Sequence, residues 1–140
     1  MTPEEKFLFD LQGFLVVKNV LSKAELEVLN AVLDEKVKEK QQNWYTSRVS
    51  NWGTPFQDLM DHPKILPYLI ELIHEKFRLD HDYCICMNQG DHKLQLHGGE
   101  GHESDHWYKY RDGRMKNGLT VFAYALTDVP TGAGGFTCIP

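Results

Sequence analysis

The first half of the chain carries apolar residues at helical spacing. An apolar residue recurs every three or four positions, at Leu26, Leu29, Leu33 and Val37. This spacing predicts an amphipathic helix, and Ser22 with Glu25 matches the capping box that begins many helices. A second apolar series, between residues 65 and 77, predicts a helix that begins at residues 61–63. Residues 7–10 are expected to end a short first helix.

The second half of the chain has the pattern of strands. Short apolar or alternating runs lie between glycines, prolines and polar turn residues, at 83–87, 93–96, 119–126 and 135–139. An earlier run, 13–20, has the same character. Residues 43–54 are expected to form a loop packed by its own aromatic side chains, and residues 100–117 a polar connection. Helices followed by antiparallel strands predict an α+β fold.

The composition is that of one globular domain. The chain has 140 residues, of which 41% are hydrophobic and 25% charged. Its formal net charge of −5 argues against a nucleic-acid partner, which would require a basic face. No apolar run approaches the roughly 18–20 residues that cross a bilayer, so we expect no membrane partner. The first residues lack the pattern of a signal peptide, and we therefore expect a cytoplasmic protein.

The chain has three cysteines, an odd number that favours reduced thiols in this setting. Cys84 and Cys86 are separated by one residue, so in a strand both side chains would point to the same face. We interpret them as small buried side chains rather than as a redox or metal pair.

Five of the seven histidines lie between residues 81 and 118, together with six of the 11 glycines. His97 directly follows the strand-like run 93–96 and precedes two glycines, which allow a close approach of the backbone to a metal or ligand. Non-haem iron oxygenases use two histidines and one carboxylate, the latter two residues after the first histidine. Here that position is Gly99, and the acids near enough to replace it are Glu100, Glu103 and Asp105.

Two other interpretations of the same segment stay open. His102-Glu103-Ser104-Asp105-His106 matches the H-E-x-x-H motif, which on a helix binds zinc through both histidines. Glycines on both sides of the motif and the polar pair inside it argue against such a helix. The histidines and acids could also belong to a solvated loop without chemistry.

Four stretches together resemble the phytanoyl-CoA dioxygenase family of iron(II)- and 2-oxoglutarate-dependent oxygenases. Residues 9–22 resemble the family's opening strand and the start of its first capped helix, and Leu96-His97-Gly98-Gly99 resembles an L-H-G-G variant of its iron motif. Residues 117–121 and 125–129 together resemble a core strand and its turn. Residues 134–140 resemble the segment that in the family continues into Gly-Ser-His.

The resemblance implies a single domain over residues 1–140, with a mainly helical scaffold at 1–80. Residues 81–140 would supply the first strands of a double-stranded β-helix, a jelly-roll or cupin-like core, and the loop that carries the metal. It also implies Fe(II), 2-oxoglutarate and O2, and hydroxylation of an aliphatic C–H bond in a small organic or acyl substrate. His97 would be the first iron ligand and Asp105 a candidate acid beside it. Tyr124 matches the place of an aromatic residue against 2-oxoglutarate.

The sequence departs from the family in two respects. Gly99 replaces the usual carboxylate, a change that in related halogenases opens a position for chloride. The distal histidine and the arginine that holds 2-oxoglutarate would lie after Pro140, so we expect the sequence to be the N-terminal part of a longer protein. The alternatives are a zinc hydrolase that uses His102, Glu103 and His106, and a non-catalytic β-barrel binding module.

Overall fold

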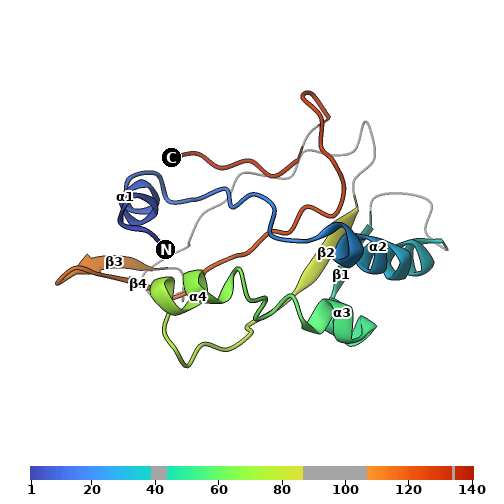
Figure 1. Ribbon diagram of the computed structural model, residues 1–140, viewed down its shortest axis with the longest axis horizontal. Helices are drawn as coiled ribbons and strands as arrows, with labels where there is room; N and C mark the ends of the chain where they lie inside the picture. Colours follow the sequence, from blue (N-terminus) through green and yellow to red (C-terminus); the bar gives the residue numbers. More distant parts are fainter. Residues whose placement is uncertain (39–43, 87–106, 134) are drawn as a thin grey trace.

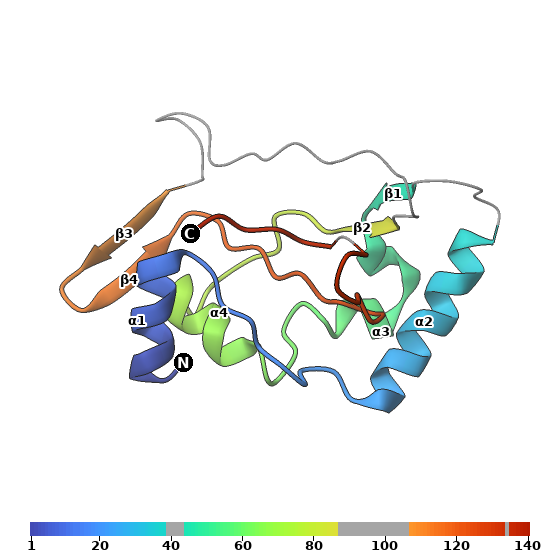
Figure 2. The same ribbon diagram turned by 90° about the horizontal axis from the view of Figure 1, so that it is seen from above.

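The computed structural model describes residues 1–38, 44–86, 107–133 and 135–140. Within them the fold is α+β, with helices in the N-terminal half and two small antiparallel sheets. Figure 1 shows two groups of elements, α1, α4, β3 and β4 at one end and α2, α3, β1 and β2 at the other, and Figure 2 shows the same division from above. Extended segments connect the two groups. Both termini lie in the group that contains α1.

Capping boxes begin the two long helices. In α2 (Lys23–Val37) the Ser22 N–H donates to Glu25 Oε2 at 2.7 Å, and the Glu25 N–H donates to Ser22 Oγ at 3.3 Å. This confirms the helix expected after Ser22. In α1 (Pro3–Gln12) Thr2 and Glu5 make the same pair of bonds. The expected first helix is therefore also present, and it ends at Gly13 in the left-handed conformation.

The helix expected from residues 61–63 begins later than predicted. The helix α4 spans Leu66–Leu72, and the residues before it form turns in which Ile65 and Leu66 donate to the His62 carbonyl. Pro67 explains the difference. In a helix that began at residue 63, Pro67 would lie in the interior, where it lacks an N–H and clashes with the carbonyl four residues earlier. In α4 it occupies the first turn, where no N–H is needed.

The first sheet pairs β1 (Trp44–Ser47) with β2 (Tyr83–Cys86). The strand β2 was expected from the sequence, whereas residues 43–54 were expected to be a loop. They contain β1, a 3-10 helix η1 (Val49–Trp52), and the start of the short helix α3 (Thr54–Gln57). The local sequence did not predict β1, because polar residues surround it and its partner strand lies almost 40 residues later in the chain. The core beside this sheet consists of Leu29, Val49 and Phe56, surrounded by Leu21, Val32, Trp52, Leu59, Cys84 and Leu126.

The second sheet is a hairpin of β3 (Tyr108–Arg111) and β4 (Arg114–Asn117). It corrects the expectation of a polar connection over 100–117 where that range is described. Asp112 and Gly113 form the turn with φ of 55° and 73°, the signs that a two-residue type I′ turn requires. Asp-Gly was therefore the signal for this hairpin. Met115 on β4 is buried, and β4 lies against α4.

Three expected strands are not strands in the structure. Residues 13–20, 119–126 and 135–139 form no ladder with any other described segment. The prediction was wrong for them because an apolar run becomes a strand only where a neighbour supplies hydrogen bonds. Residues 121–126 still alternate between exposed and half-buried, as a strand does. The expected strand 93–96 lies outside the described residues, and those described form no closed barrel.

Candidate functional site

A pocket of about 280 Å³ lies between the start of α2 and residues 55–62. Its apolar lining comes from Leu21, Ala24, Val28, Leu29, Pro55 and Leu59. Its polar lining comes from Glu25, Asp58 and His62. A mainly apolar pocket with a few convergent polar groups is the usual form of a small-molecule site, so the state of these polar groups decides what the pocket can do.

His62 is the buried polar group of this pocket, with 6% of its surface exposed. Its Nδ1 accepts a hydrogen bond from the Lys64 N–H at 3.2 Å, and its Nε2 lies 3.2 Å from Glu25 Oε1. Because Nδ1 is an acceptor, the ring proton of the neutral form is on Nε2, which donates to the carboxylate. Both ring nitrogens are therefore occupied, and neither is available to a metal or to a substrate proton.

Glu25 holds its negative charge strongly. Hydrogen bonds from Ser22, through its side chain and then its backbone, and a further one from His62 lower the pKa of Glu25 to about 2. A carboxylate with this pKa is too weak a base for proton abstraction near neutral pH. The Glu25–His62 pair therefore joins the first turn of α2 to the turn before α4. Sequence reasoning identified Glu25 as a cap but not its pairing with His62, because nothing local relates residues 37 positions apart.

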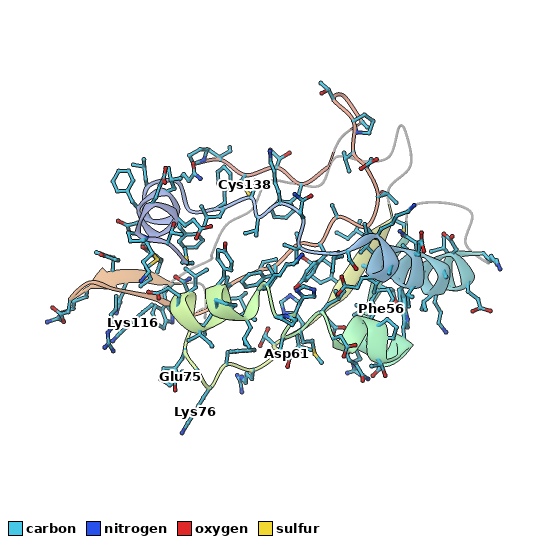
Figure 3. All side chains as sticks on the ribbon, viewed as in Figure 1. Phe56, Asp61, Glu75, Lys76, Lys116 and Cys138 are labelled. Carbon is cyan, nitrogen blue, oxygen red and sulfur yellow. The ribbon has the colours of Figure 1, made fainter. Side chains whose placement is uncertain are left out.

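Tyr124 is the expected site residue that the structure describes. It is half-buried, and its hydroxyl donates to the Leu59 carbonyl at 2.8 Å. Burial, and then the charge of Asp61, raise the pKa of Tyr124 to about 12, so the phenol is neutral at physiological pH. Asp61 lies in the middle of the molecule, on the segment before α4 (Figure 3). The hydroxyl of Tyr124 is already bonded to the protein, which leaves its ring as the part that could contact a cosubstrate.

The other expected site residues lie outside the described residues. These are His97 and Asp105, with the alternative acids Glu100 and Glu103 and the two histidines of the H-E-x-x-H motif, His102 and His106. Within the described ranges, no group of three or more His, Cys, Asp or Glu side chains is placed to hold a metal ion. Of the expected site residues, the structure thus places Tyr124, and the expected iron ligands lie outside the residues that it describes.

In the part of the chain that the structure describes, no helix has both the length and the apolar character to span a membrane. Comparisons of the chain with protein-family models, with curated proteins and with solved structures find no match.

Proposed function

We propose that this chain belongs to an iron(II)- and 2-oxoglutarate-dependent oxygenase that hydroxylates an aliphatic C–H bond of a small organic or acyl substrate. The observation that carries the proposal is the order and spacing of the four stretches that resemble phytanoyl-CoA dioxygenases. In this order His97 directly follows a strand-like run and precedes two glycines. The proposal includes a double-stranded β-helix core for the complete protein.

Two features of the described residues support this proposal. The capped start of α2 follows the first of the four stretches, in the order that the resemblance implies. Residues 121–126 alternate between exposed and half-buried, the burial pattern that a strand of a sheet has. Tyr124 lies in this segment, half-buried.

In this proposal His97 holds the iron, and Asp105 is the acid assigned to the position left by Gly99. Iron and 2-oxoglutarate together would supply the oxidising power that an unactivated C–H bond requires. The part of Tyr124 is to present its ring to the cosubstrate, because its hydroxyl is bonded to Leu59.

The proposal is tested by iron content and by release of succinate from 2-oxoglutarate in the complete protein. We expect His97→Ala to lose both. The matched control is His74→Ala, because His74 is exposed and lies just after α4, where its Nδ1 accepts a hydrogen bond from the Lys76 N–H. Unchanged iron and succinate in His97→Ala would contradict the proposal.

The same measurement separates the alternatives. Zinc in place of iron, lost in His102→Ala, would favour a hydrolase that uses the H-E-x-x-H motif. Complete protein without any tightly bound metal would favour a non-catalytic binding module. Chlorinated product in the presence of chloride, with succinate release intact, would favour a halogenase-like site at Gly99.

A further inference from the structure

The two cysteines of β2 lie side by side. Cys84 and Cys86 are on the same face of the strand, both half-buried, with their Sγ atoms 4.0 Å apart. The expectation of a shared face is therefore confirmed. Cys84 also packs against the core cluster of Leu29, Val49 and Phe56. Cys84 thus lies at one edge of the core, with Cys86 beside it on the same face of β2.

The strand geometry opposes a disulfide between these two residues. Alternate residues of an extended strand have Cα atoms about 6.6–6.8 Å apart, at the upper limit of about 6.8 Å that a disulfide spans. The sulfurs would also have to approach to about 2.05 Å. The ladder of β2 with β1, in which Cys84 is opposite Thr46 and Cys86 opposite Trp44, holds the strand extended. The gap between the sulfurs is better suited to an atom that bridges them.

The size of the gap selects the kind of ion. With metal–sulfur bonds of about 2.3 Å, as zinc makes to cysteine, an ion equidistant from sulfurs 4.0 Å apart has an S–metal–S angle of roughly 120°. This angle is that of a trigonal ion of low coordination number. Zinc requires four ligands, and the described side chains offer no group of three or more His, Cys, Asp or Glu for a metal. Soft thiolate ligands favour Cu(I).

In place of the purely structural role expected from the sequence, we propose that Cys84 and Cys86 form a binding site for a soft monovalent cation of the Cu(I) class. Each thiol exchanges its proton for a bond to the ion, both protons pass to solvent, and no oxidation state changes. The third position of the ion is filled by water, chloride or a small thiol.

The raised pKa of Cys84 argues against a reactive thiol. Burial, and then the neighbouring Cys86, raise the pKa of Cys84 to about 12. A thiol with this pKa keeps its proton at neutral pH and is a poor nucleophile. A soft cation nevertheless displaces that proton, because the metal–sulfur bond replaces the S–H bond in the same step.

The test is an anaerobic titration of the complete chain with Cu(I) in competition with a chromogenic Cu(I) chelator. We expect one Cu(I) per chain, and a loss of affinity of more than about 100-fold in Cys84→Ser and in Cys86→Ser, beyond what loss of a supporting group costs. The matched control is Cys138→Ser, which should bind as the wild type does. Cys138 is exposed and lies on the C-terminal segment, away from β2 (Figure 3).

A second measurement does not depend on the folding of these variants. X-ray absorption of copper-loaded wild-type chain should count at least two sulfur neighbours per Cu(I). Coordination by nitrogen and oxygen alone would overturn the proposal, and so would equal loss of affinity in Cys138→Ser. Zinc bound as tightly as Cu(I) would also overturn it, because the geometry then fails to select the ion.

Discussion

The side chain of Asn30 donates a hydrogen bond from Nδ2 to the carbonyl oxygen of Leu126, 2.8 Å away and 96 residues later in the chain. Asn30 lies in α2, and Leu126 ends the apolar run that follows the hairpin. The Leu126 side chain also packs against the core cluster. This bond supplies a polar partner to a segment that has no ladder with other described residues.

Replacing Asn30 should therefore loosen the docking of residues 119–126 on α2. We expect Asn30→Ala to lower the free energy of unfolding by about 1–2 kcal/mol, because it leaves the half-buried Leu126 carbonyl without its donor. Asn30→Asp should cost more, since it places a carboxylate beside that carbonyl oxygen. Chemical denaturation measures both. Asn51→Ala, at an exposed asparagine, is the control, and an equal loss there would contradict the assignment.

The capping box of α2 can be tested in the same way. Ser22→Ala removes the acceptor of the Glu25 N–H and should lower the free energy of unfolding by about 1 kcal/mol, whereas Ser22→Asp should restore most of it. Lys23→Ala is the control, because Lys23 is exposed and its 4.0 Å ion pair with Glu27 is worth at most about 0.5 kcal/mol. If Ser22→Ala and Lys23→Ala have equal effects, the cap does not stabilise the helix.

Gly113 is the residue on which the β3–β4 turn depends. A Cβ at this position meets no atom within 4 Å, so substitution introduces backbone strain at φ +73° without a steric clash. We expect Gly113→Ala to destabilise the hairpin by about 1–2 kcal/mol, the cost of a left-handed residue with a side chain. Gly113→Asn should cost less, because asparagine tolerates this conformation. Cross-strand NMR contacts between Tyr110 and Met115 report on the hairpin, and equal losses in both variants would contradict the strain argument.

The predictable parts of this fold are the local ones. The capping box of Ser22 and Glu25 determines where α2 begins. Pro67 determines where α4 begins, but the longer apolar series around it suggested an earlier start. The Asp-Gly turn was equally local, but the polar residues around it suggested a connection. Strand pairing was different, because β1 pairs with a strand far along the chain and residues 119–126 pair with no described segment.

The side-chain pairs follow the same rule, in that the sequence predicts those formed by local geometry and not those formed by tertiary packing. The shared face of Cys84 and Cys86 follows from strand geometry alone, and the structure confirms it with a distance of 4.0 Å between the sulfurs. The Glu25–His62 pair depends on how α2 packs against the turn before α4. No spacing in the sequence carries that information, because it arises from tertiary packing.

The Glu25–His62 pair also makes stability depend on pH. The pKa of Glu25 is lowered from its ordinary 4.5 to about 2 in the folded chain, so the folded state favours the charged carboxylate more than the unfolded state does. A lowered pKa contributes stability above the unfolded value, and this stability is lost as the pH falls from about 4.5 toward 2. The wild type should therefore lose stability over this window through Glu25.

Glu25→Gln tests this dependence, because glutamine has a similar shape but does not titrate. Its single carbonyl oxygen can accept from only one of the two donors, the His62 Nε2–H at Oε1 or the Ser22 N–H at Oε2, so part of the loss of stability is independent of pH. We expect Glu25→Gln to be less stable than the wild type near neutral pH, and the difference in unfolding free energy to shrink as the pH falls below about 4. Glu27→Gln is the control on the same helix, since Glu27 is exposed and forms a weak 4.0 Å pair with Lys23. A difference for Glu25→Gln that stays constant from neutral to acid pH would show that the hydrogen bonds of Glu25 do not favour its charged form, because only a carboxylate that titrates differently in the two states makes stability depend on pH.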